Sequence, residues 1–298
     1  MEHVNLKNTN YVFAQDFKHD DSIRTSFNKL TNAVFGFSLE NWYQDGFWGD
    51  YYVPYALLHN NEVVSNVSIN RIEFDIQNER KVGIQIGTVM TDEKYRNQGL
   101  NKFILNHIIK EWEGRSDFIY LFANDSVLDF YPKFNFEEVE EYQCVKSINT
   151  HPTTSSLKRL NVENKADVAL LMETVKMSIP MSTVSMVNNV SLIMFYCMSY
   201  KKNSIFYIEE LEAIVIADFE GNTLFLNDVF SKEPVALNDL IRAMSNEKVN
   251  RVALGFTPLN DTGFEKRLLQ GGDTLFMLKT GANCFKQNHW MFPVLSHA

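Results

Sequence analysis

Apolar and polar residues alternate in the first third of the chain in a pattern that predicts an antiparallel meander. Residues 63–74 show the two-residue period of a half-buried strand, and residues 52–58 and 81–91 are also typical of strands. Polar residues at 60–61 and 77–80 separate these stretches and predict short turns. We therefore expect three consecutive antiparallel strands.

The spacing on either side of this meander predicts helices and two further strands. Residues 20–35 form an amphipathic helix that begins at aspartates able to cap it, and residues 100–112 form a second helix. Residues 118–123 are wholly apolar, as in a buried parallel strand. A short helix is expected at 126–133 and a last strand at 136–144.

A run of proline, threonine and serine predicts a linker at residues 149–156, between a first domain at 1–148 and a second at 157–298. The second domain repeats the order of elements of the first without repeating its residues. Its expected elements are helices at 165–177 and 237–244 and strands at 204–208, 212–218, 223–229, 251–256 and 274–278. The fold class is therefore mixed α/β, with a mostly antiparallel central sheet flanked by helices and a second α/β domain after it.

Composition excludes several classes of protein. The 298 residues carry a net charge of −9, which argues against a nucleic-acid partner because phosphate neutralisation needs an excess of Lys and Arg. Acidity suits a cationic substrate, although it also serves solubility. No apolar run reaches the roughly 20 residues of a membrane span, and the polar N-terminus is unlike a signal peptide. Cys144, Cys197 and Cys284 lack metal-ligand spacing and fit buried free thiols, so we expect a cytoplasmic protein.

The polar run at residues 92–99 joins a predicted strand to a predicted helix and has the features of an anion site. The first backbone N–H groups of a helix lack partners and lie at the positive end of its dipole. Gly99 would let a diphosphate approach the backbone closely, and Arg96 could add charge or brace the turn. The run lacks the Gly-Lys-Ser/Thr ending of a P-loop and the glycines of a Rossmann fingerprint. An ordinary strand-to-helix turn is the structural alternative.

This run resembles the CoA-binding signature of the GNAT acetyltransferase superfamily, [Gln/Arg]-x-x-Gly-x-[Gly/Ala]. Arg96 and Gly99 match it, whereas Asn101 replaces the final small residue, so its side chain must turn aside. The resemblance implies a GNAT fold that binds acetyl-CoA as acyl donor. It places the pantetheine arm on the preceding strand and the diphosphate on the turn and helix start. The implied CoA-binding residues are Val89, Met90, Thr91, Arg96, Asn97, Gln98, Gly99, Leu100, Asn101 and Lys102.

A second motif resembles the same family. Asn124 follows the apolar strand, and Tyr131 comes seven residues later. By resemblance, Asn124 would contact CoA and Tyr131 would protonate or hydrogen-bond the departing sulfur; a Tyr packed in the core is the structural alternative. Asn135 stands where the family has Gly, and Asn tolerates the left-handed conformation. The oxyanion would be held by a backbone N–H near Val89 or Met90.

The acceptor side is less defined by the sequence. The resemblance places residues 42–52, which contain Trp42, Phe47, Trp48, Tyr51 and Tyr52, at the wall of the acceptor site, where aromatic faces would suit a cation. Packing of a helix pair explains the same residues. No general base can be identified: four acidic residues and the C-terminal carboxylate of Ala298 remain open. The acidic residues are Glu40, Asp45, Glu73 and Asp75.

The second domain lacks the signature, because residues 230–236 contain no glycine and Glu233 would repel a diphosphate. It resembles a degenerate GNAT domain that does not bind CoA; a non-GNAT α/β substrate domain is the alternative. The leading function is therefore transfer of an acetyl group from acetyl-CoA to a primary amine of a small molecule or peptide. A non-catalytic CoA-binding sensor or scaffold and transfer of a larger acyl group remain alternatives. The sequence predicts no membrane partner and leaves a homo-oligomer open.

Overall fold

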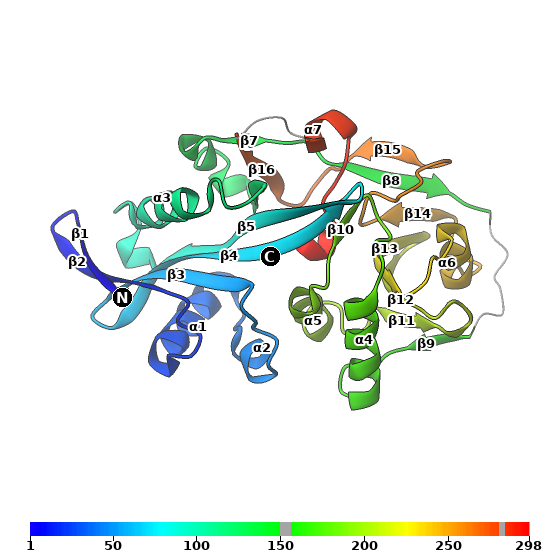
Figure 1. Ribbon diagram of the computed structural model, residues 1–298, viewed down its shortest axis with the longest axis horizontal. Helices are drawn as coiled ribbons and strands as arrows, with labels where there is room; N and C mark the ends of the chain where they lie inside the picture. The colour runs from blue at the N-terminus through cyan, green and yellow to red at the C-terminus, as the bar shows by residue number, and fades with distance from the viewer. Residues whose placement is uncertain (150–155, 280–283, 298) are drawn as a thin grey trace.

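The computed structural model describes residues 1–149, 156–279 and 284–297, and it contains two mostly antiparallel sheets (Figure 1). The first sheet has nine strands in the order β1-β2-β3-β4-β5-β6-β16-β7, with β10 paired to β4. Its strands are β1 (Glu2–Leu6), β2 (Thr9–Gln15), β3 (Tyr52–His59), β4 (Glu62–Ile76), β5 (Glu79–Thr91), β6 (Phe118–Ala123), β7 (Phe136–Glu138), β10 (Val184–Met186) and β16 (Thr274–Leu278).

The second sheet has seven strands in the order β15-β8-β14-β13-β12-β11-β9. They are β8 (Tyr142–Ser147), β9 (Leu157–Arg159), β11 (Ile205–Ile208), β12 (Ala213–Glu220), β13 (Thr223–Ser231), β14 (Arg251–Leu254) and β15 (Glu265–Leu268). The α-helices are α1 (Asp21–Phe35), α2 (Glu40–Gln44), α3 (Leu100–Trp112), α4 (Lys165–Met177), α5 (Val190–Met198), α6 (Leu237–Met244) and α7 (Cys284–Asn288).

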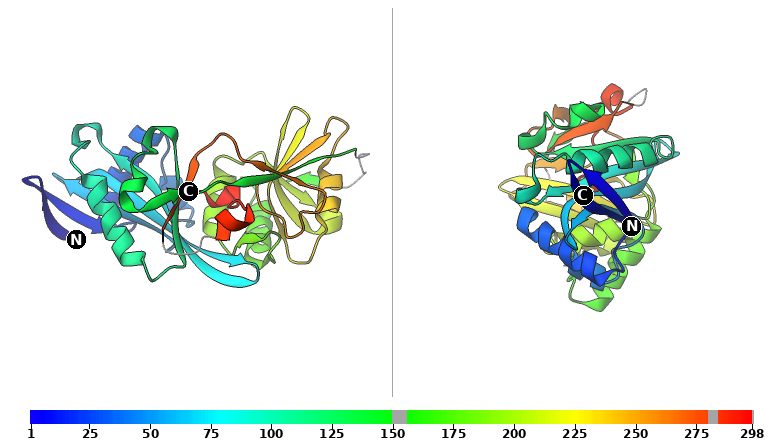
Figure 2. Two further views of the ribbon diagram at one scale, coloured as in Figure 1. Left: turned by 90° about the horizontal axis from the view of Figure 1, so that it is seen from above. Right: turned by 90° about the vertical axis from the view of Figure 1, so that its left-hand side faces the viewer.

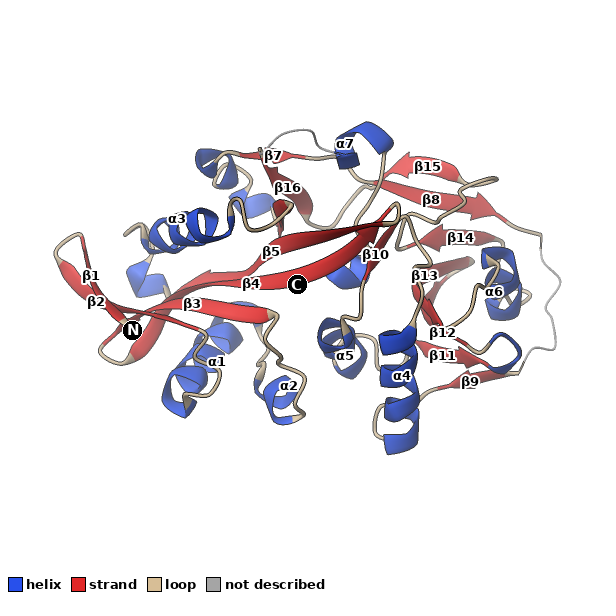
Figure 3. Ribbon diagram, viewed as in Figure 1, coloured by secondary structure: helices blue, strands red, loops and turns tan. Residues whose placement is uncertain are grey.

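Helices cover both faces of the first sheet (Figure 3). Apolar residues of α3, including Ile104 and Ile108, pack on the face formed by Ile84, Ile86 and Leu121. Helices α1 and α2 cover the opposite face, where α1 contributes an apolar stripe to a separate cluster. Asp20 caps α1 by accepting hydrogen bonds from two backbone amides of its first turn, as the sequence predicted.

The two sheets exchange strands across the predicted domain boundary. Strand β16, from the second half of the chain, lies between β6 and β7 of the first sheet. Strand β8, from the first half, lies between β14 and β15 of the second sheet. The division into 1–148 and 157–298 stays a prediction, and residues 150–155 of the expected linker lie outside the described residues.

The segment after α7 packs between the two sheets (Figure 2, left). Trp290, Met291, Phe292 and Leu295 are buried, which confirms the expected docking of this apolar segment. The amide of Phe292 donates a 2.8 Å hydrogen bond to Oε1 of Glu141, in the connection between β7 and β8. The C-terminal segment is therefore tied to the point where the chain leaves the first sheet for the second.

Most expected elements are present, but several differ, and β9, β10, β15 and α7 were not predicted. The strand predicted at 136–144 is wrong: β7 and β8 belong to different sheets, and the chain crosses between them at residues 139–141. The β1–β2 hairpin was not predicted; its strands are short. The short helix at 126–133 is instead two 3₁₀ turns, Asp125–Val127 and Tyr131–Phe134.

Other sequence expectations can also be compared with the described residues. Cys144 and Cys197 are buried free thiols, as expected; the Cys284 side chain is not among those described. Among the described helices, none is long and apolar enough to cross a membrane. The cytoplasmic location stays a prediction.

Phe276 of β16 tests how much this inserted strand contributes to stability. Its side chain is 2% exposed and packs in the cluster beneath α3. Phe276→Ala should lower the free energy of unfolding by about 3–5 kcal/mol, because it removes a buried ring and leaves a cavity. Denaturant unfolding would measure the change. Phe219→Ala is the control, since Phe219 is 40% exposed, and it should cost less than about 1 kcal/mol. An equal loss of unfolding free energy in the two variants would contradict a large contribution of β16 to stability.

Glu141 makes stability depend on pH. Burial raises the pKa of its carboxyl from 4.5 to about 7. Between these values the folded protein keeps a proton that the unfolded chain releases, so the free energy of unfolding should fall as pH rises from 4.5 to 7. The stabilisation that protonated Glu141 gives the folded state is fully present below pH 4.5. About 3 kcal/mol of it is lost by pH 7.

Glu141→Gln cannot ionise and should lack this decline, whereas the exposed neighbour Glu140→Gln should retain it. Urea unfolding at several pH values would measure the three profiles. Parallel profiles for the wild type and Glu141→Gln would show that Glu141 does not cause the dependence.

Candidate active site

Strands β5 and β6 run parallel and then separate, which opens a wedge in the first sheet. Their register extends from Gly83 opposite Phe118 to Ile86 opposite Leu121 and ends there. Residues 87–91 have no β6 partner among the described strand pairs. On its other side β6 continues to pair with β16, as far as Ala123 opposite Thr274. Strand β6 therefore follows β16 and leaves β5.

A bulge bends β5 at the same point. Gly87 is opposite Ser68 and Met90 is opposite Asn66, so two residues, Thr88 and Val89, face the single residue between them on β4. Thr88 has a φ of 47°, a rare conformation for a β-branched residue. Its carbonyl accepts a 3.0 Å hydrogen bond from the side-chain Nδ2 of Asn66. The bulge turns the backbone of β5 toward the wedge.

The turn between β5 and α3 has the geometry that the sequence predicted for an anion site. Asn97 and Gly99 have φ values of 62° and 82°, and Gly99 is the N-cap of α3. No side chain caps this helix end in the described chain, so its first amides are available to a ligand. Asn101 turns aside as expected, because its Oδ1 accepts a 2.6 Å hydrogen bond from Ser65.

The N-terminal hairpin of β1 and β2 supports this turn through two hydrogen bonds. Tyr11 of β2 donates a 3.0 Å hydrogen bond to Oε1 of Gln98, and Nζ of Lys7 donates to the carbonyl of Asn97. The Gln98 side chain is thus directed toward β2. If Gln98 contacts a ligand in the wedge, it does so through its backbone.

The wedge and the turn form one cleft of about 1030 Å³. Of the predicted CoA-binding residues, all but Gln98 line it. They are Val89, Met90, Thr91, Arg96, Asn97, Gly99, Leu100, Asn101, Lys102 and Asn124. Met90 contributes backbone there, because its buried side chain packs with the cluster beneath α1.

The charges in the cleft are opposite in sign to the charge of the chain. Three cations line it, Arg96, Lys102 and Lys133, and Asp273 is the one carboxylate among the described lining residues. The chain as a whole carries a net charge of −9. A local excess of cations beside open helix amides favours a multiply charged anion.

Tyr131 also lines the cleft. Its side chain is 4% exposed and contacts the rings of Phe130, Phe136 and Phe276. Burial, with a smaller contribution from Asp273, raises the pKa of its hydroxyl to about 12. The phenol is therefore protonated at neutral pH and can donate a hydrogen bond or a proton into the cleft.

Comparison with known proteins assigns this part of the chain to a family. Residues 11–139 match the family model described as an acetyltransferase (GNAT) domain. Over these residues the chain is similar in sequence to GNAT acetyltransferases. An N-alpha-acetyltransferase 50 from Danio rerio is 30% identical over 111 residues, which are 34% of this chain and 64% of the relative. The chain thus spans less than two thirds of the length of this curated relative.

Solved structures resemble both halves of the chain at the level of fold. A probable N-acyltransferase from Enterococcus faecalis V583 has a TM-score of 0.58 at 13% identity, covering 90% of this chain and 72% of that one. A GCN5-related N-acetyltransferase from Kribbella flavida has a TM-score of 0.54 at 12% identity, covering 90% and 71%. The fold expectation of a GNAT domain followed by a second α/β part is confirmed.

A second pocket of about 230 Å³ adjoins the cleft of the GNAT domain. Trp42 and Tyr52 from the predicted aromatic wall line it, with ring centroids 5.5 Å apart. Helix α5 also contributes lining residues, including Phe195 and Tyr196. The other predicted wall residues, Phe47, Trp48 and Tyr51, are not among its lining residues.

The upstream carboxylates that the sequence left open do not line the cleft or this pocket. Glu40 accepts hydrogen bonds from Arg24 and Asn28, and Glu73 is paired with Arg71. Asp75 accepts a hydrogen bond from the backbone N–H of Asn78, and Asp45 is the C-cap residue of α2. Ala298 lies outside the described residues.

The structure adds three polar residues to the site that the sequence analysis missed. Asp273 precedes β16 and lines both cavities. Asn70 and His297 line the second pocket. The pair Gly271-Gly272 ahead of Asp273 marked a turn, but only the insertion of β16 into the first sheet brings this aspartate to the cleft.

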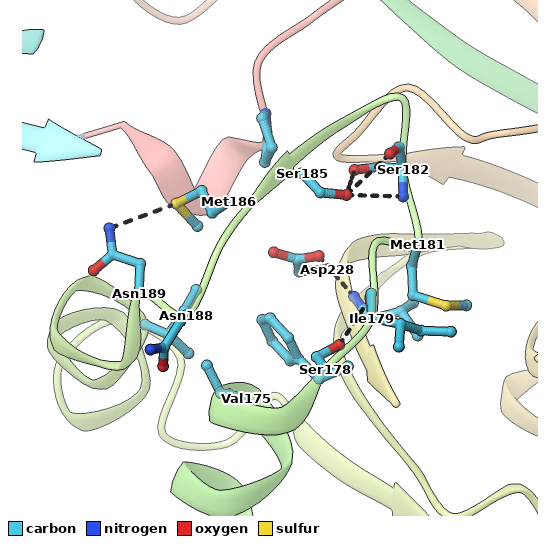
Figure 4. Close-up of a pocket in the computed structure, with 14 residues that line it drawn as sticks. Val175, Ser178, Ile179, Met181, Ser182, Ser185, Met186, Asn188, Asn189 and Asp228 are labelled. Carbon is cyan, nitrogen blue, oxygen red and sulfur yellow. Dashed lines mark hydrogen bonds between the residues drawn. The ribbon is translucent and has the colours of Figure 1, made fainter. Parts of the chain in front are cut away.

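The second sheet has a similar parallel pair, but its wedge is filled. Strands β13 and β14 are paired from Thr223 opposite Arg251 to Leu226 opposite Leu254. Beyond this point, each strand bonds to another segment of the chain. The backbone N–H of Ile179 donates a hydrogen bond to the carbonyl of Ser231, and the backbone N–H of Val294 donates one to the carbonyl of Gly255. A cavity of about 20 Å³ remains beside Asp228, large enough for about one water (Figure 4).

Proposed function

We propose that this protein is an acetyl-CoA-dependent N-acetyltransferase that transfers the acetyl group directly to a primary amine. The observation that carries the proposal is the cleft of about 1030 Å³, which combines open helix amides, three cations and a buried protonated tyrosine. The acyltransferase class is that of the GNAT domain. The donor, the amine acceptor and the roles of individual residues are inferred here.

The cleft fits CoA in both charge and polarity. The amides from Gly99 to Lys102, with Arg96, would hold the diphosphate, and the backbone of residues 89–91 would hold the pantetheine arm. Apolar side chains that include Phe35 and Phe130 line the cleft and would contact that arm. Asn124 would add a polar contact at the end of β6.

Acetyl-CoA supplies an activated thioester when bound. Backbone amides of the β5 bulge, at Val89 or Met90, would donate hydrogen bonds to the thioester oxygen as it gains negative charge. The Tyr131 hydroxyl would give its proton to the departing sulfur and recover one from the amine nitrogen as the amide forms. An ammonium substrate also releases one proton to solvent, so the reaction is balanced.

The second half of the chain has a different role in this proposal. Its wedge is filled by its own chain, and its turn after β13 contains Glu233 and no glycine. We assign the GNAT-like part at 157–298 no CoA site of its own. It supplies β16 to the first sheet and α5 to the second pocket.

A direct test of the function is thiol release from acetyl-CoA in the presence of a panel of primary amines. The proposal predicts amine-dependent release of free CoA and an acetylated amine detectable by mass spectrometry. Tight binding of CoA with no turnover for any amine would contradict catalysis and favour a CoA-binding sensor or scaffold.

Gly99→Val should weaken CoA binding by at least about tenfold, because a branched side chain would both strain a φ of 82° and crowd the diphosphate. Gly114→Val is a matched control: Gly114 has a φ of 84°, a Cβ added there would have no atom within 4 Å, and it lies past the far end of α3. It should bind CoA like the wild type. Calorimetric titration with CoA measures both, and equal affinities would refute this placement of the diphosphate.

Tyr131→Phe should reduce kcat at least tenfold and leave CoA affinity nearly unchanged, because it removes the proton donor and keeps the ring. Tyr142→Phe removes a hydroxyl that bonds to the exposed Glu140, and it should have no effect. Steady-state thiol release and CoA titration measure the two quantities. Unchanged turnover in Tyr131→Phe would remove this residue from the mechanism.

A further inference from the structure

The 230 Å³ pocket adjoins the proposed CoA cleft. Four residues line both spaces and mark the junction: Phe37, Thr88, Phe122 and Asp273. Thr88 belongs to the β5 bulge and Phe122 to β6, so the junction lies where the two strands separate. Any group at this junction is next to the proposed thioester site.

Resting on the proposed function, we infer that this pocket binds the acceptor, and that the acceptor is a small monoamine with an apolar, ring-sized body and an oxygen at the end remote from the amine. The charge, the body and the oxygen of this ligand each correspond to a different part of the pocket wall.

The single positive charge follows from Asp273. It is the one carboxylate among the described residues that line the pocket, and it lies at the junction with the cleft. An ammonium group held there would have its nitrogen beside the thioester site. A polyamine would bring further charges into a pocket that has no second carboxylate in the described lining.

The size and shape of the body follow from the walls. Apolar and aromatic side chains that include Trp42, Phe122 and Phe195 line the pocket. Aromatic faces favour both an apolar ring and a nearby cation. A volume of about 230 Å³ equals that of about eight liquid waters, which suits one ring with a short chain.

The oxygen follows from Asn70, which lines the pocket but not the cleft. Asn70 is 4% exposed, and its Nδ2 has no hydrogen-bond partner in the part of the chain that the structure describes. The buried Nε2 of His297, another lining residue, is also unpartnered among the described residues. Burial lowers the pKa of His297 to about 3, so its ring is neutral and can accept a hydrogen bond from a hydroxyl.

A ligand that displaces water from these atoms without replacing its hydrogen bonds loses affinity. Tyramine and 2-phenylethylamine differ only by one hydroxyl and therefore test this end of the pocket. Calorimetric titration of the CoA-saturated protein should give a dissociation constant about tenfold lower for tyramine. Spermidine and triglycine should bind at least tenfold more weakly than tyramine.

Two variants localise the contacts. Asp273→Asn should weaken both aromatic amines at least tenfold, whereas Glu247→Gln, which removes an exposed carboxylate beyond α6, should weaken neither. Asn70→Leu should abolish the advantage of tyramine and leave 2-phenylethylamine nearly unchanged. CoA affinity, measured in each variant, reports whether the fold is intact; the ligand comparison in the wild type does not depend on any variant.

The inference is overturned if spermidine or triglycine binds as tightly as tyramine, if the two aromatic amines bind equally, or if Asp273→Asn has no effect. These titrations use CoA, not acetyl-CoA, and need no turnover. Amine binding without thiol release would therefore contradict the proposed function and retain the pocket. Thiol release with spermidine alone would retain the function and refute the pocket.

Discussion

The pairing of β6 with β16 is the interaction on which the site depends. A parallel pair such as β5 and β6 could continue to the ends of both strands, and the sheet would then be closed. Here β6 pairs with β16 along residues 120–123, whereas its register with β5 ends at Leu121. Residues 122 and 123 therefore have a strand partner on the β16 side alone. The peptide groups of β6 thus keep partners on one side while the wedge opens on the other, which limits the cost of unpaired backbone.

The same insertion joins the two halves of the chain into one functional unit. Because β16 follows directly after Asp273, the strand that holds the wedge open also positions the carboxylate at its edge. The segment that follows α7 then fills the wedge of the second sheet through Val294. The first half supplies the proposed donor site, and the second half supplies strand pairing and one wall of the second pocket.

The sequence predicted those parts of the site that local patterns encode. Asn135 adopts the left-handed conformation, with a φ of 67°, as expected from its place in the motif, and Gly99 has a φ of 82°. The helix at 100–112 and the strand at 118–123 have the predicted bounds. Each of these features is determined by residues within a few positions of one another, which periodicity and turn chemistry can detect.

The rest depends on contacts between distant segments. Thr274–Leu278 was correctly predicted as a strand, but no local pattern indicates which sheet it joins. For the same reason Asp273, Asn70 and His297 did not stand out, since they come from three separated parts of the chain. The stretch at 136–144 was misassigned because both sheets accept apolar residues there, and the crossing at 139–141 carries no glycine or proline.

Hydrogen exchange of the backbone amides with and without CoA tests the central claim most directly. If the wedge and the start of α3 hold the coenzyme, amides in residues 87–91 and 99–102 should exchange more slowly when CoA is bound. Those of β13 and residues 232–236 in the second sheet should not change. Protection confined to the second sheet, or unchanged exchange in the wedge under saturating CoA, would contradict this account.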